Sequence, residues 1–216
     1  MKALLSKKML YKTTRRLFHN TYQYKIVLVC AGAHFFRSND LSNVLDKLSE
    51  IDITSKKANW RSNFIKTQDD LDYAFKLHTA LGKIQDIELR VESPWISIYS
   101  NSKKDIDMLA KLDPTNVKYI CIPPKNSSLT NDTVIMPKMD FDYRVTLGKT
   151  MQENTAFITW ASTNKKCKLT KSCIRDLGKT HSWGGTHFYI TGDNNLLMAK
   201  MHLGGSISKV ERIIKA

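Results

Sequence analysis

Two kinds of hydrophobic spacing alternate along this chain, and their order constrains the fold more than any other feature. Apolar residues that recur every three or four positions predict amphipathic helices, whereas strict apolar–polar alternation predicts strands with one solvated face. Helical spacing covers residues 41–51, 67–84, 103–112 and 150–162. Strand patterns cover residues 25–30, 87–92, 95–99, 117–122, 141–147, 186–191 and 196–203.

Local signals mark several boundaries of these elements. Thr67 with Asp70, and Thr150 with Glu153, have the spacing of a capping box, in which two side chains satisfy backbone N–H groups at a helix start. The run 192–195, Gly-Asp-Asn-Asn, is made of turn formers. We therefore expect helices to begin near Thr67 and Thr150, and a β-hairpin to join the strands 186–191 and 196–203.

The mixed order of neighbouring strands and helical crossovers favours an α+β fold, with mixed or antiparallel sheets and helices on one face. The elements from 67 to 122 have the order of a split βαβ, ferredoxin-like unit, and those from 141 onward predict a second. The polar segment 123–131 is the expected linker. It separates residues 1–122, a basic arm plus an α+β unit, from residues 132–216, an α+β unit ending in the hairpin. One continuous domain is the alternative. The sequence contains no evident internal repeat.

Composition narrows the class of protein. A hydrophobic content of 42% with 25% charged residues is typical of globular chains and argues against disorder. The longest apolar runs are strand-sized, well short of the roughly 18–20 residues that a spanning helix needs, so we expect no membrane partner. Glycine-rich phosphate-binding motifs and the H-E-x-x-H zinc motif are missing from the sequence, and we expect no cofactor and no metal.

Cysteine usage points to a reducing compartment. The sequence holds four cysteines, too few for a disulfide scaffold, and Cys30 and Cys121 lie in predicted buried strands. We expect an intracellular protein of the cytoplasm or nucleoid. The acid-free amino terminus is also typical of transit peptides, so mitochondrial import stays open. Cys167, Cys173, His181 and His187 are a zinc alternative, although their spacing is loose.

The charge of the chain is concentrated at its two ends. The formal net charge is +14. Residues 1–39 contain eight basic and no acidic side chains, and residues 163–216 contain ten basic and three acidic ones. If both ends lie on one face, they form a patch that neutralises several phosphates. A solvated basic surface without a partner is the alternative.

Basic side chains with interleaved aromatic rings suit single-stranded nucleic acid, because cations follow the phosphates and rings stack on bases. This pattern predicts an RNA-binding or single-stranded-DNA-binding protein. The expected contact residues are Lys7, Lys8, Lys12, Arg15, Arg16, Lys56, Lys57, Arg61, Lys165, Lys166, Lys168, Lys171, Arg175 and Trp183.

Two other functions compete with simple binding. His181 and His187, beside Lys179 and Tyr189, have the residue types that a metal-independent endoribonuclease needs as acid, base and anion stabiliser. A structural subunit that docks in a larger nucleoprotein or viral assembly through its basic arm is the other alternative. Catalysis is the less favoured hypothesis because the spacing of these residues does not specify their geometry.

Overall fold

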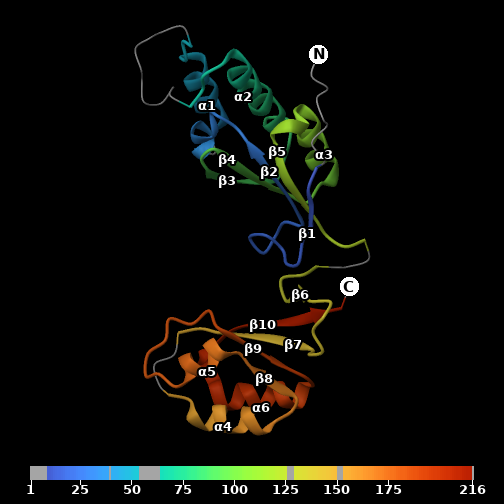
Figure 1. Cartoon of the computed structure of the whole chain (residues 1–216), viewed down its shortest axis with the longest axis vertical. Helices are drawn as coiled ribbons and strands as arrows, with labels where there is room; N and C mark the ends of the chain where they lie inside the picture. Colours follow the sequence, from blue (N-terminus) through green and yellow to red (C-terminus); the bar gives the residue numbers. More distant parts are fainter. Residues whose placement is uncertain (1–8, 39, 54–63, 126–128, 150–152, 216) are drawn as a thin grey trace, which may run out of the picture. The chain divides into compact units, whose positions relative to one another are not determined.

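The computed structural model describes residues 9–38, 40–53, 64–125, 129–149 and 153–215. The chain divides into two compact units, Met1–Pro124 and Lys125–Ala216 (Figure 1). Within the described residues, the fold is α+β, with two mixed five-stranded sheets and six α-helices. No helix in these segments is both long enough and apolar enough to cross a membrane.

The first unit contains one sheet and three α-helices. Its elements are β1 (Tyr11–Thr13), β2 (Tyr24–Val29), α1 (Leu41–Ser49), α2 (Gln68–Leu81), β3 (Ile87–Glu92), β4 (Trp95–Ser100), α3 (Lys103–Leu112) and β5 (Val117–Ile122), with short 3-10 turns at Ala33–Arg37 and Pro114–Asn116. The strand order is β1-β5-β2-β4-β3. β1 pairs with β5 in parallel, and the other neighbours are antiparallel.

The helices of the first unit cover one face of its sheet. Ile26 and Leu28 alternate along β2 and are completely buried, in one cluster with Leu48 of α1, Leu77 of α2 and Leu109 of α3. Since successive strand residues point to opposite faces, the residues between them lie on the second face of the sheet, which points away from these helices and is called the open face, although Val27 on it is itself buried. That open face is where the candidate site lies.

The second unit repeats this architecture with other lengths. Its elements are β6 (Thr133–Ile135), β7 (Tyr143–Leu147), α4 (Thr155–Thr163), β8 (Cys167–Leu169), α5 (Lys171–Leu177), β9 (His187–Ile190), α6 (Asp193–Leu203), a 3-10 turn at Gly204–Ser206, and β10 (Ile207–Ile214). The strand order is β6-β10-β7-β9-β8, with β6 and β10 parallel and the other neighbours antiparallel. Phe157, Leu177, Phe188 and Ala199 belong to a core between the sheet and its three helices.

The two units share one spatial order of strands. Setting aside the short first strand of each, the last strand lies beside the first, followed by the third and the second. The connections differ, because β3 and β4 follow each other directly in the first unit, whereas α5 lies between β8 and β9 in the second. In both units the short strand adds in parallel to the outer edge of that last strand. This topological duplication has no counterpart in a sequence repeat.

The predicted hairpin is wrong. Residues 193–203 form α6, and its buried residues Leu196, Ala199 and Leu203 have helical spacing. Gly192, with φ 84, turns the chain after β9, and the Asn195 side chain donates to the Thr191 carbonyl at 2.8 Å. The turn formers therefore start a helix, and the strand that closes the sheet is β10, which was not predicted.

The helix predicted to begin near Thr150 begins further along the chain. α4 begins at Thr155, five residues after Thr150, with Asn154 at its N-cap. Thr150 lies outside the described residues. The first box is confirmed: Thr67 accepts from the Asp70 backbone N–H and Asp70 accepts from that of Thr67, both at 3.1 Å.

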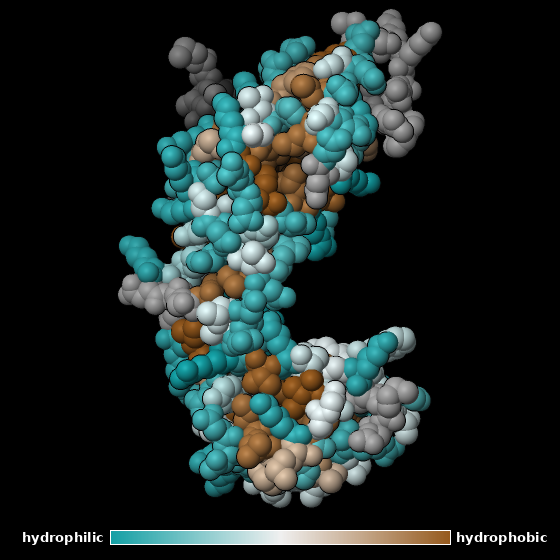
Figure 2. Space-filling model, turned by 180° about the vertical axis from the view of Figure 1, so that it is seen from behind, coloured by the Kyte–Doolittle hydropathy of each residue, from teal (hydrophilic) through white to brown (hydrophobic). Residues whose placement is uncertain are grey.

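The surface is mostly hydrophilic, but apolar residues gather in places. On the face drawn in Figure 2, separate apolar patches lie on each unit. Among the residues that the structure describes, Trp183 and Met201 are the most exposed large hydrophobic side chains, at 87% and 71%. Exposed apolar groups that gather on a surface are typical of sites that bind a partner.

Candidate nucleic-acid interface

Aromatic rings and lysines share the open face of the first sheet. Strand pairing places Lys25 of β2 opposite both Tyr99 of β4 and Cys121 of β5. Val27, two residues on, lies opposite Tyr119 of β5. Directly paired residues lie on the same face of a sheet, so Lys25, Tyr99 and Tyr119 all point away from the helices.

Three lysines lie against aromatic rings on this face of the sheet, those of Trp95, Tyr99 and Tyr119. The Lys118 Nζ is 3.3 Å from the centre of the Trp95 ring, and the Lys12 Nζ is 3.9 Å from that of Tyr119. The Lys25 Nζ lies 5.2 Å from the Tyr99 ring centre. A cation over a ring face is attracted by the ring's electron density. The interface therefore alternates positive charges and flat apolar surfaces.

The segment between β1 and β2 covers part of this face. Phe18 and Tyr22 form an isolated antiparallel bridge. The Phe18 ring centre is 5.4 Å from that of Tyr99, and the His19 ring packs edge-on to Tyr99 at 4.5 Å. Tyr99 is consequently only 4% exposed, whereas Trp95 is 39% exposed. With Tyr119 half-buried, Trp95 and Tyr119 are the rings that a ligand can reach.

The two edges of this sheet differ in charge. Glu88 and Glu92 on β3 pair with Tyr99 and Trp95 and so lie on the open face. Arg90 between them forms an ion pair with Glu92 at 2.5 Å. Since carboxylates repel phosphates, the β1–β5–β2 side is the part of the face suited to a polyanion.

The face of the second sheet that points away from its helices is partly covered, because Tyr189 and Ile213 pack there with Met139 and Phe141. It carries a connected polar network. The completely buried Glu211 contacts Arg144 at 3.4 Å and Lys209 at 3.3 Å. An Arg144 Nη donates to the His187 Nδ1 at 3.1 Å, and the His187 Nε2 lies 3.1 Å from the Tyr189 hydroxyl. Because a guanidinium can only donate, Nδ1 must accept, so the neutral ring carries its proton on Nε2 and donates to Tyr189.

The residues predicted for catalysis fall into two groups. His187 and Tyr189 lie together on β9, within this network. Lys179 and His181 are exposed residues of the segment that precedes β9. Both ring nitrogens of His187 already take part in hydrogen bonds, which positions the ring in the sheet. Ribonuclease activity stays a prediction.

The predicted basic residues of the second unit are spread over it. Lys165 and Lys166 precede β8, Lys168 pairs with Tyr189 on the open face, and Lys171 and Arg175 lie on α5. All five are exposed. Because α5 packs on the opposite face of the sheet, these residues do not form one surface within the unit.

The predicted basic residues of the first unit are only partly described. Lys12 belongs to the interface through Tyr119. Arg15 is exposed and Arg16 half-buried in the segment after β1. The remaining predicted residues, Lys7, Lys8, Lys56, Lys57 and Arg61, lie outside the described residues.

Sequence reasoning missed the residues that best define the interface. They are Lys25, Trp95, Lys118 and Tyr119, and all four lie in correctly predicted strands. The strands of Lys25, Lys118 and Tyr119 were interpreted as buried elements. The alternation of polar and apolar residues could have placed each on an open face. Their pairing across β2, β4 and β5 depends on strand register, which no local pattern specifies.

The zinc alternative has no support in the described residues. Cys167, Cys173, His181 and His187 are all described, and no three metal-ligating side chains there are close enough to hold an ion. All four cysteines of the chain are free thiols. Burial raises the pKa of Cys167 to about 11 and that of Cys173 to about 12.

Comparison with protein-family models, with curated proteins and with solved structures found no match to this chain.

Proposed function

We propose that this protein binds single-stranded nucleic acid, RNA or DNA, and that the open face of the first sheet is its main contact surface. The observation that carries the proposal is the two lysine–ring pairs on the rings that a ligand can reach, Lys118 with Trp95 and Lys12 with Tyr119. Bases stack on exposed rings, and neighbouring lysines neutralise the phosphates that connect the bases.

We also infer that both units are ferredoxin-like. In each, the spatial order of the strands, with the last strand beside the first and then the third and the second, supports this assignment, although the second unit adds α5 between its second and third strands. Four-stranded sheets of RNA-binding modules stack two or three bases on their aromatic residues.

The excess positive charge agrees with this proposal. The first 39 residues hold no acidic side chain, and β1 brings Lys12 from that segment to the sheet edge beside β5. A path over β5 and β2 avoids the carboxylates of Glu88 and Glu92 on β3. We therefore expect the strand of nucleic acid to cross the lysine-bearing side of the face.

The proposal is tested by fluorescence anisotropy with labelled 20-nucleotide oligouridylate and oligothymidylate and the full chain. If about four phosphates are contacted, the dissociation constant should rise roughly 50-fold between 50 and 200 mM salt. Trp95→Ala should weaken binding about 5- to 100-fold through lost stacking. Lys118→Glu should weaken it and reduce the salt dependence.

Lys111→Glu is the matched control, because Lys111 is exposed on α3, in the helical layer on the other face of the sheet. It makes the same change in net charge and should have a small effect. If Lys111→Glu and Lys118→Glu weaken binding equally, only net charge matters, and binding at this particular face is contradicted. Cleavage of the oligouridylate without divalent metal would favour the ribonuclease alternative.

A further inference from the structure

We propose that Trp183 and Lys149 form a second stacking site, located in the second unit, for one unpaired base of the single-stranded nucleic acid. This inference rests on the proposed function but on different residues. Trp183 is 87% exposed, and the Lys149 Nζ lies 4.9 Å from the centre of its ring. Neither residue belongs to the sheet face of the first unit.

Backbone contacts hold the segment that carries Trp183. Gly184 follows it with φ 78, and a Cβ at this position would lie 2.4 Å from the carbonyl atoms of Gly148. The Gly185 N–H donates to the Leu147 carbonyl at 2.7 Å, and the Leu147 N–H donates to the Thr186 carbonyl at 2.8 Å. The close approach of the two chains therefore fixes the backbone next to the exposed indole ring.

The same contact positions the lysine. Lys149 directly follows Gly148, the residue against which Gly184 packs. One backbone junction thus presents a cation and a large aromatic ring together. A ring presented in advance loses little conformational entropy when a base stacks on it. The ammonium group beside the ring is placed to neutralise the phosphate of the same nucleotide.

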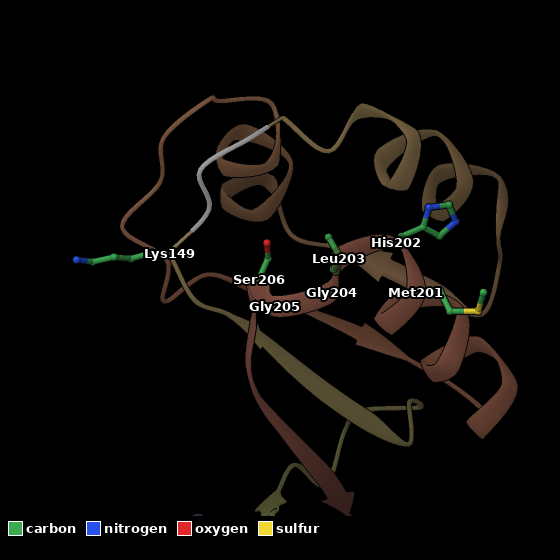
Figure 3. A pocket seen from close by; sticks show the side chains of 7 residues that line it. All are labelled: Lys149, Met201, His202, Leu203, Gly204, Gly205 and Ser206. Carbon is green, nitrogen blue, oxygen red and sulfur yellow. The ribbon is translucent and has the colours of Figure 1, made fainter.

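Lys149 also lines a hollow beside the end of α6. It has a volume of about 450 Å³ and is lined by Lys149, Met201 and the turn Gly204–Ser206 at the end of α6, among others. In Figure 3 the Ser206 hydroxyl points into the open space, while the Lys149 side chain extends away at the opposite end. Volumes of this order accommodate small organic ligands. The hollow is large enough for the nucleotide that follows the stacked base.

The surroundings favour a nucleic acid over an apolar peptide. Lys179 and His181 are exposed on the segment leading to Trp183. Asp176 is the one acidic residue between 163 and 183 in the sequence, and it forms an ion pair with Arg175 at 3.6 Å. A single indole ring in a positively charged setting fits the alternating flat and charged groups of a polynucleotide.

The test uses the full chain with labelled 20-nucleotide oligothymidylate. Trp183→Ala should raise the dissociation constant about 5- to 100-fold, Lys149→Ala should raise it less, and Trp183→Phe should retain most of the affinity because a ring remains. Leu197→Ala is the control: Leu197 is 57% exposed on α6 and lies outside the site. The oligonucleotide should also quench the part of the tryptophan emission that Trp183→Phe removes.

Three outcomes are distinguishable. Weaker binding of Trp183→Ala with quenching of Trp183 emission supports the second site. Unchanged affinity in Trp183→Ala and Lys149→Ala, in a protein that Trp95→Ala weakens, overturns the second site and leaves the proposed function standing. If the wild-type chain binds no oligonucleotide, both proposals fall. Circular dichroism of each variant verifies that it is folded.

Discussion

At the scale of single residues, the surroundings of a position decide whether it tolerates a side chain. Gly184 and Gly185 are adjacent, and both have left-handed backbones, with φ 78 and 84. Gly184 packs directly on the Gly148 backbone, whereas nothing lies within 4 Å of the position where a Cβ of Gly185 would be. A side chain at Gly184 would therefore overlap the neighbouring backbone, whereas one at Gly185 would not.

We predict that Gly184→Ala destabilises the protein more than Gly185→Ala. At Gly185 only the left-handed conformation opposes a side chain, which costs about 1–2 kcal/mol of unfolding free energy. At Gly184 the overlap with the Gly148 carbonyl adds at least the roughly 1–3 kcal/mol typical of overpacking. Urea denaturation of both variants measures the difference. Equal losses would contradict the close approach at Gly148.

At the scale of elements, two similar Thr-x-x-acid patterns have different outcomes. Thr67 and Asp70 satisfy each other's backbone N–H groups at the start of α2. The pattern at Thr150 and Glu153 precedes α4, which begins only at Thr155. A capping pattern marks a helix start only where the helix packing also begins there, because most helix stability in a protein comes from tertiary contacts.

We predict that Thr67→Ala lowers the free energy of unfolding by about 1 kcal/mol, since it leaves the Asp70 backbone N–H without its cap. Thr79→Ala is the matched control. Thr79 is exposed inside α2 and donates to the Phe75 carbonyl, and alanine is the better helix former at such a position. Chemical denaturation that ranks Thr79→Ala as the more harmful change would contradict this assignment of the cap.

At the scale of the whole molecule, two separate cores share one topological plan. Ile26, Leu77 and Leu109 belong to the core of the first unit, and Phe157 and Phe188 to that of the second. Each unit encloses its core between one sheet face and the helices that cover it. The chain thus consists of two α+β units, each with helices on one face of its sheet and a second face that is partly covered.

We predict that a core deletion acts mainly within its own unit. Phe188 is completely buried, and Phe188→Ala should destabilise the second unit by about 3–5 kcal/mol. Amide hydrogen exchange should then show lost protection in β7, β9, β10 and α6, with protection of β2 and β4 largely retained. Equal loss of protection in β2 and β4 would show that the two cores unfold as one.

The candidate site was harder to predict than the elements. The basic and aromatic composition indicated nucleic-acid binding, and Lys12 and Trp183 were among the predicted residues. Trp95 and Tyr119 were missed because each contacts a lysine that belongs to a different strand of the sheet. The helix 193–203 was missed as well, since its short apolar run after turn formers fits a strand as readily as a helix.

The sequence by itself determined the class of most elements, the box at Thr67 and the concentration of charge at the chain ends. These are properties of residues close together in the chain, where periodicity and capping act. Only the tertiary structure decided the strand order, the duplicated plan and the pairing of Lys118 with Trp95 and of Lys149 with Trp183. Such pairs depend on register and on loop closure between distant segments, and local patterns carry no information about either.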